Sequence, residues 1–319
     1  MTQLKDDILA GRRRALAKAI TLVESSRADH QDNAQQLLAS LLPHTGKSIR
    51  LGFTGTPGVG KSTFIEAFGL QLTAQGHRVA VLAVDPSSTR TGGSILGDKT
   101  RMELLSKDPN AFIRPTPSGG TLGGVARRTR EAMLLCEAAG YDVVLIETVG
   151  VGQSEIAVAD MVDMFLLMLS PGGGDDLQGI KRGIMELADL VIINKADGDF
   201  KKAAMRAAGD YTSALHLMRP KFPCWTADVV LTSALNNEGL GMVWQKIQEF
   251  ETAMKDSGQL EKMRAEQAKA WMWSEIHDQL IDVFKSRHPD KVTDMEQQVL
   301  AGKTPPTAAA HLLLKDFLG

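Results

Sequence analysis

The chain has 319 residues, of which 43% are apolar and 23% charged, and its net charge is −2. This composition is typical of a soluble globular protein. The absence of a strong net charge or a long run of like charge excludes the basic surface of a typical nucleic-acid or anionic-membrane binder. Two cysteines without paired spacing favour a reducing, cytoplasmic compartment, and we expect neither a signal peptide nor a membrane-spanning segment.

Residues 1–45 are predicted to form a helical N-terminal extension. Two apolar stripes have helical spacing, and they comprise Ile8, Leu16, Ile20 and Val23, and then Leu37, Leu38, Leu41 and Leu42. The pattern changes at Ile49, where short runs rich in Val, Ile and Leu begin to alternate with helical segments. These runs occupy residues 49–54, 78–84, 142–147, 163–169, 189–193 and 228–232. They indicate buried parallel strands, so we expect an α/β domain over residues 46–255 with a doubly wound, mostly parallel sheet.

A phosphate-binding motif follows the first predicted strand and opens a predicted helix. The sequence GTPGVGKST matches GxxxxGK[ST] in full, and its residues are Gly55, Thr56, Pro57, Gly58, Val59, Gly60, Lys61, Ser62 and Thr63. Glycines let successive backbone N–H groups curl around a phosphate, and the N-terminus of the following helix favours the same negative charge. We expect Lys61 to reach the β- and γ-phosphate oxygens and Ser62 to bind Mg²⁺. The motif therefore predicts a nucleoside triphosphate site in a P-loop domain.

Three acids lie at or near the ends of strands that neighbour this loop. Asp85 directly follows the strand at 78–84, Asp98 lies in a glycine-containing loop, and Glu147 ends the strand at 142–147. Each is a candidate to hold the Mg²⁺ shell or to orient the attacking water, and which acid does which stays open. Gly150, three residues after Glu147, is placed for its N–H to sense the γ-phosphate.

The loop at residues 170–183 contains three consecutive glycines, adjacent acids and then bases, directly after a buried strand. This loop could be a plain surface connector. Alternatively, it could lie at the ligand-binding face and change its conformation. We favour the reordering loop, with Asp175 and Lys181 as the charges that exchange partners.

The base-recognition residues follow the next two strands. Asn194, Lys195 and Asp197 form an NKxD motif at a strand end, where ligands of α/β sheets bind. A carboxylate can accept both the N1–H and the 2-amino group of guanine, and adenine lacks that pair of donors. Ser233, Ala234 and Leu235 follow the next strand and are expected to supply a backbone N–H to the guanine O6. The motifs therefore favour GTP over ATP.

Residues 256–319 are predicted to form a helical arm. Trp273, Ile276, Leu280 and Val283 have three-four-three spacing, and Pro305 and Pro306 precede a last helix at 308–317. An amphipathic stripe does not specify its partner, so the arm could fold back on the domain or pair with a second copy.

Three segments resemble the MeaB/ArgK family of GTPases over nearly the whole chain. They read VDPSSTRTGGSILGDKTRM at 84–102, ETVGVGQSE at 147–155 and GGDDLQGIK at 173–181. The resemblance implies a homodimeric, Mg²⁺-dependent GTPase that acts as a chaperone for adenosylcobalamin-dependent methylmalonyl-CoA mutase or a related acyl-CoA mutase. Such a chaperone gates cofactor loading and protects the mutase. It also implies that the 170–183 loop communicates with the mutase.

Two other functions are alternatives to this one. A nickel-insertion GTPase needs a Cys/His cluster, whereas the seven histidines and two cysteines are scattered. An ATP-dependent kinase linked to amino-acid transport is disfavoured by the NKxD motif. No cobalamin-ligating DxHxxG pattern occurs, so we do not expect this chain to bind cobalamin itself.

Overall fold

The structure is a computed structural model that describes residues 2–25, 27–84, 102–116, 122–148, 154–171 and 182–318. The chain divides into two compact units, Met1–Gln267 and Ala268–Gly319. The boundary lies inside a long helix, α13 (Gln259–Arg287), which belongs to both. Each unit is described by itself below.

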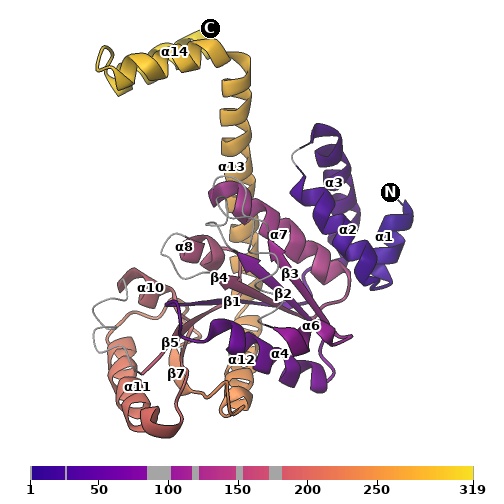
Figure 1. The fold of residues 1–319 in the computed structure, drawn as a ribbon, viewed down its shortest axis with the longest axis vertical. Helices are drawn as coiled ribbons and strands as arrows, with labels where there is room; N and C mark the ends of the chain where they lie inside the picture. The colour runs from indigo at the N-terminus through magenta and orange to yellow at the C-terminus, as the bar shows by residue number, and fades with distance from the viewer. Residues whose placement is uncertain are drawn as a thin grey trace. The chain divides into compact units, whose positions relative to one another are not determined.

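The described part of the first unit contains a seven-stranded sheet in the order β3-β2-β4-β1-β5-β6-β7, with every neighbouring pair parallel (Figure 1). The strands are β1 Ile49–Gly55, β2 Val79–Val84, β3 Ala111–Thr116, β4 Val143–Thr148, β5 Met164–Leu169, β6 Leu190–Ile193 and β7 Asp228–Leu231. The predicted doubly wound α/β fold is confirmed. Because the chain leaves β1 toward β2 and later returns to β5 on its other side, the end of β1 is the switch point where such sheets bind ligands.

The predicted strands agree with the observed ones to within one residue at each end, but their number was too small. The strand β3 was not predicted, because Arg114 and Pro115 interrupt its apolar pattern. A proline has no backbone N–H to donate to a neighbouring strand. It is therefore tolerated in an edge strand, where one side of the backbone has no strand to pair with. Pro115 meets this condition, since β3 pairs only with β2 within the described sheet.

Helices cover both faces of the sheet (Figure 1). One face carries α4 (Lys61–Ala74), α6 (Glu103–Lys107) and α12 (Leu240–Asp256), and the other carries α7 (Leu122–Ala138), α8 (Ser154–Ala159), α10 (Arg182–Leu187) and α11 (Lys201–His216). Short 3₁₀ turns occur at η1 (Leu42–His44) and η3 (Gly198–Phe200). The helices α1 (Thr2–Leu9), α2 (Arg13–Glu24) and α3 (Ala28–Leu41) pack against α7, so the predicted N-terminal extension is part of the first unit.

Successive strand residues point to opposite faces, and the core is divided accordingly. In β6, Leu190 and Ile192 belong to the cluster under α4 and α12, whereas Val191 and Ile193 pack with α10 and α11. This two-sided burial explains why β6 is apolar at every position rather than at alternate ones.

Charged side chains close the amino-terminal edge of the sheet, opposite the phosphate loop. The Arg50 guanidinium donates to the Glu137 carboxylate, with 2.7 Å between Nε and Oε1, and both side chains are buried. Burial by itself would raise the pKa of Glu137, but the hydrogen bond and positive charge of Arg50, together with Ser48, outweigh it and lower that pKa. Arg264 from α13 forms a second pair with the fully buried Asp163 and donates to the carbonyl oxygens of Gly46 and Ser48. These bonds fasten the first turns of α13 to the sheet.

The second unit continues α13 and adds α14 (Pro289–Leu300) and α15 (Pro306–Leu318). The rings of Phe284 and Phe317 lie 5.2 Å apart between centroids, and Lys291 forms an ion pair with Asp316. These contacts hold the three helices together within the unit. No helix in the described ranges is both long enough and apolar enough to cross a membrane.

Candidate functional site

The phosphate-loop motif forms the turn between β1 and α4, at the switch point of the sheet. Gly55 (φ +152°) and Gly60 (φ +94°) have backbone angles that other residues rarely adopt. Added Cβ atoms there would lie 2.3 Å from the Met168 carbonyl oxygen and 2.7 Å from Asn194 Nδ2, respectively. Both positions thus require glycine, because the loop is in close contact with β5 and with the residue that follows β6.

Lys61 is the first residue of α4, and its side chain is nearly buried. Its Nζ donates to the carbonyl oxygens of Gly55 at 2.6 Å and Thr56 at 3.3 Å, so the ammonium group lies inside the turn. Burial lowers the pKa of Lys61, and the negative charges of Glu147 and Glu155 oppose that shift. This places a cation, balanced by two carboxylates, within the loop predicted to hold phosphate.

Ser62 and Glu147 meet next to this ammonium group. The Ser62 hydroxyl donates to Glu147 Oε1 at 2.9 Å, and Glu147 is the buried second-last residue of β4. Behind them, Thr148 donates to Thr54 across the two central strands at 3.1 Å. A hydroxyl and a carboxylate side by side are the oxygen donors that Mg²⁺ prefers, and Mg²⁺ sites on phosphates need only one or two protein ligands. The residues present therefore fit the predicted metal.

Several predicted site residues lie outside the described part of the chain. They are Asp85, Asp98, Gly150, Asp175 and Lys181. Among the described residues, no group of three or more His, Cys, Asp or Glu side chains gathers at metal-binding distance. The structure thus brings Lys61, Ser62 and Glu147 together and leaves the roles of the other acids as predictions.

Asn194 links the base-recognition motif to the phosphate loop. Its Nδ2 donates to the Val59 carbonyl oxygen at 3.0 Å, and its Oδ1 accepts from the Ala234 N–H at 3.0 Å and the Thr232 hydroxyl at 3.3 Å. Lys195 has a left-handed backbone (φ +61°), and its Nζ donates to the Gly58 carbonyl oxygen at 2.7 Å. The ends of β1, β6 and β7 are therefore joined through one buried amide and one lysine.

Asp197, the last residue of this motif, directly precedes the 3₁₀ turn η3, and its carboxylate accepts a hydrogen bond from the Ser233 hydroxyl. An ionised carboxylate has about four acceptor positions, so this bond leaves capacity for a base. The N–H groups of Ser233 and Ala234 already donate to the Glu238 carbonyl oxygen and to Asn194. Of the three residues predicted to face the guanine O6, Leu235 is therefore the candidate whose N–H would donate, and its side chain is 80% exposed.

Glu155 and Thr232 were not among the predicted site residues. Glu155, on α8, is only 1% exposed and acts electrostatically on Lys61, while Thr232 supports Asn194. Glu155 lies in the segment 147–155 that carries the family resemblance, and Thr232 directly precedes Ser233. The roles of both side chains depend on the position of α8 and β7 beside the phosphate loop, which these residue types do not predict.

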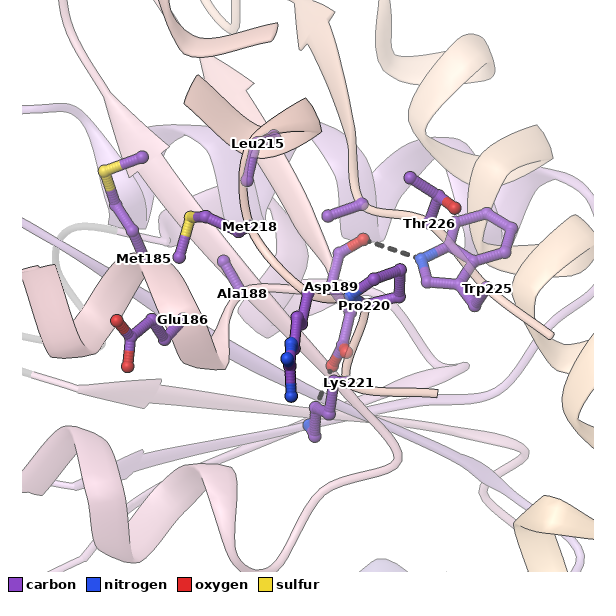
Figure 2. Close-up of a pocket in the computed structure, with 12 residues that line it drawn as sticks. Met185, Glu186, Ala188, Asp189, Leu215, Met218, Pro220, Lys221, Trp225 and Thr226 are labelled. Atoms are coloured by element: carbon purple, nitrogen blue, oxygen red, sulfur yellow. Dashed lines mark hydrogen bonds and ion pairs between the residues drawn. The ribbon is translucent and has the colours of Figure 1, made fainter. Parts of the chain in front are cut away.

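A small cavity of about 30 Å³ is lined by Asp189, Lys221 and Trp225, among other residues (Figure 2). It lies beside the amino-terminal end of β6, whereas the phosphate loop follows the carboxyl end of β1. Asp189, which precedes β6, accepts from Lys221 at 3.3 Å, and the Trp225 indole donates to the Asp189 carbonyl oxygen at 2.8 Å. Burial raises the pKa of Asp189, against the charge of Lys221. The volume suits one or two water molecules rather than a nucleotide.

Comparisons with known proteins bear on this site. A family model described as Methylmalonyl Co-A mutase-associated GTPase MeaB matches residues 16–289. A putative GTPase of Caulobacter vibrioides is 59% identical over 316 residues, 98% of this chain and 97% of that protein. The mouse methylmalonic aciduria type A homolog, described as mitochondrial, is 52% identical over 328 residues, 99% of this chain and 79% of that protein. A solved structure described as LAO/AO transport system kinase is 40% identical, covers 100% of this chain and 97% of its own, and has a TM-score of 0.79.

Proposed function

The chain belongs to the MeaB family of P-loop GTPases, and from this membership we propose that it is a chaperone for an adenosylcobalamin-dependent acyl-CoA mutase, with methylmalonyl-CoA mutase as the first candidate. In this role it binds and hydrolyses GTP, gates cofactor loading and protects the mutase from inactivation. The observation that carries the proposal is the family match along most of the chain. The complete phosphate and base motifs support it.

We assign the phosphate side of the site as follows. Gly55 to Thr63 bind the phosphates of GTP, and Lys61 moves its ammonium from the Gly55 carbonyl to the β- and γ-phosphate oxygens. Ser62 and Glu147 would hold Mg²⁺, which would neutralise charge on the phosphates. Asp85 and Asp98 complete the metal shell or orient the water that attacks the γ-phosphate, and the Gly150 N–H senses that phosphate.

The base side of the site comprises the residues after β6 and β7. Asp197 accepts from the two adjacent guanine donors, and the Leu235 N–H donates to O6. The stem of Lys195 and the exposed side chain of Leu235 are apolar surfaces suited to contact a planar base. Asn194 holds both halves together, since it bonds to Val59 and Ala234 simultaneously.

A partner switch is the second part of the proposal. The helix α8 follows the segment that contains Gly150, the helix α10 follows residues 172–181, and these two helices pack against each other. We therefore propose that a change at the γ-phosphate shifts α8, and that α8 passes the shift through α10 to the loop that carries Asp175 and Lys181. The nucleotide motifs contain no obvious arginine finger, and Gln153 is only a weak candidate for orienting water, so we propose that hydrolysis is slow until the mutase binds.

We expect methylmalonyl-CoA mutase to accelerate GTP hydrolysis by at least about tenfold but by less than about 10³-fold. This is below the roughly 10³- to 10⁵-fold gain of a supplied arginine, because reordering a loop adds no new charge. Asp175→Ala and Lys181→Ala should keep the basal rate and lose most of the stimulation. The measurement is steady-state hydrolysis with and without the mutase.

Asp210→Ala and Lys202→Ala, on exposed positions of α11, are matched controls that should keep full stimulation. If the two loop variants are stimulated as strongly as the unaltered protein, residues 170–183 are only a connector. If the mutase has no effect on any form, the chaperone proposal itself is wrong.

We also propose that the protein forms a homodimer through the second unit. Trp273, Ile276, Leu280 and Val283 are 60%, 38%, 55% and 42% exposed on α13. Their three-four-three spacing forms one apolar stripe, and an identical stripe on a second copy is a self-complementary partner for it.

Light scattering should therefore report twice the chain mass for the unaltered protein. Leu280→Glu should shift it to the monomer, because a carboxylate would be buried in the apolar contact. Lys285→Glu is the control on the same helix. A monomeric unaltered protein would rule the dimer out.

We also propose that the protein is located in the cytoplasm. Cys136 and Cys224 are both free thiols in the structure, which is consistent with the reducing cytoplasm predicted from the sequence. The mouse relative is described as mitochondrial, so the compartment need not be shared across the family.

A further inference from the structure

We infer that Glu155, a buried carboxylate on α8, is a positioning residue that holds the Lys61 ammonium inside the phosphate loop and thereby limits the affinity of the site for nucleotide phosphates. The inference rests on the part of the proposed function that places phosphates at the loop from Gly55 to Thr63. It does not depend on Mg²⁺ or on the mutase.

The start of α8 lies at the same edge of the sheet as the phosphate loop. The chain leaves the carboxyl end of β4, forms α8 and enters β5 at its amino end, so α8 runs antiparallel to these parallel strands. The strand β1 lies between β4 and β5, and its carboxyl end leads into the phosphate loop. Glu155 is the second residue of α8 and is therefore near that end.

Contacts along β1 agree with this direction and hold the helix in place. A Cβ added at Gly52 would lie 2.9 Å from Val158 Cγ1 and 3.1 Å from Val162 Cγ2, so Val158 of α8 packs directly on the backbone of β1. Asp163 follows α8, and its N–H donates to the Arg50 carbonyl oxygen at 2.8 Å, nearer the amino end of β1. The helix can move away from the strand only by giving up this packing.

The Glu155 carboxylate faces the end of β1 from this helix. Glu155 precedes Val158 by three positions, so the two share a helix face, and Glu155 lies about 4.5 Å nearer the phosphate loop along the axis. At that end of β1, the Gly55 carbonyl oxygen accepts from Lys61 Nζ at 2.6 Å. Glu155 is only 1% exposed, and its negative charge opposes the effect of burial on the pKa of Lys61. The carboxylate therefore acts as a buried counter-ion of the loop lysine.

A fixed counter-ion competes with phosphate for this lysine. The Gly55 and Thr56 carbonyl oxygens and the charge of Glu155 hold the ammonium in the turn, and a bound phosphate must draw it away from them. The phosphate also brings negative charge toward a carboxylate that α8 keeps in place. Because like charges repel more strongly in a buried site than in water, Glu155 weakens phosphate binding and favours nucleotide release.

The test measures the binding of guanosine, GMP, GDP and GTP to the full chain in the absence of Mg²⁺, by isothermal titration calorimetry. Glu155→Gln and Glu155→Met remove the charge and keep the side-chain length. We expect both to bind GDP and GTP about tenfold more tightly, with a smaller gain for GMP and none for guanosine. A unit charge about 10 Å from another, at an effective dielectric constant of about 20, changes binding by roughly this factor.

Two further variants serve as controls. Glu155→Asp retains the charge and should bind all four compounds much as the unaltered protein does. Glu103→Gln removes a carboxylate from an exposed i,i+4 pair with Lys107 on α6, and it should change none of the affinities.

The dependence on phosphate number separates a positioning role from a merely structural one, because a disturbed fold would change guanosine binding as well. Unchanged or weaker binding of GDP and GTP in a folded Glu155→Gln or Glu155→Met protein overturns the inference, and so does an equal gain for guanosine or in Glu155→Asp. Either charge-free variant that folds is sufficient for this decision. If the unaltered protein binds GTP no more tightly than guanosine, the assignment of phosphates to the loop is wrong, and the inference fails with it.

Discussion

Lys61→Ala should reduce GTP hydrolysis below detection while the fold remains intact. The phosphate loop surrounds the Lys61 ammonium, which donates to the Gly55 and Thr56 carbonyl oxygens. The negative charges of Glu147 and Glu155 balance it. A preorganised donor that faces transition-state charge is worth about 10²- to 10³-fold in kcat. Because the basal reaction is already expected to be slow, this loss removes the measurable rate. Single-turnover hydrolysis of radiolabelled GTP is the measurement.

Lys255→Ala provides the matched control, since it removes the same charge from an exposed i,i+4 pair with Glu251 on α12. It should hydrolyse GTP normally. Circular dichroism and melting temperature check that Lys61→Ala still folds. A folded Lys61→Ala protein with near-normal turnover would mean that the loop from Gly55 to Thr63 does not bind the reacting phosphates.

Asp197→Asn should change the preferred nucleotide from GTP to xanthosine triphosphate. The carboxylate can accept both guanine donors, whereas an amide can accept only one and presents a donor toward the other. Xanthine carries an oxygen at that second position, so the amide donor pairs with it. A hydrogen bond to a charged group contributes about 1.5–3 kcal/mol, so we expect GTP affinity to fall about 10- to 100-fold. Competition binding with GTP, xanthosine triphosphate and ATP measures the change.

Asp199→Asn, two residues along in η3, makes the same chemical change and should leave the nucleotide preference as it was. Unaltered GTP affinity in Asp197→Asn, with no gain for the xanthosine nucleotide, would contradict the base assignment. The competition measurement with ATP tests the kinase alternative. A protein that binds ATP as tightly as GTP does not use Asp197 to select guanine.

The local sequence determined much of the nucleotide-binding frame. Continuous Val, Ile and Leu runs identify strands buried on both faces, and the order of the P-loop, the acid at the end of β4 and the NKxD motif places each at a strand end. Gly55 and Gly60 could be recognised from the motif, since close backbone approach to phosphate requires them. Each of these features depends only on residue types and their spacing within a few positions of the sequence.

Tertiary structure decided the rest, because it depends on which distant segments meet. Whether Arg114 and Pro115 interrupt a strand or form an edge strand depends on the pairing of β3 with β2 alone. Asn194 joins Val59 to Ala234, and Glu66 caps α6 across 38 positions of sequence. A side chain's own neighbours in sequence do not encode such contacts, since a buried acceptor is satisfied by whichever N–H group the packing brings to it. For this protein, the sequence therefore determined the type of site, and only the placement of α4, α8 and β7 relative to the end of β1 revealed the residues that support it.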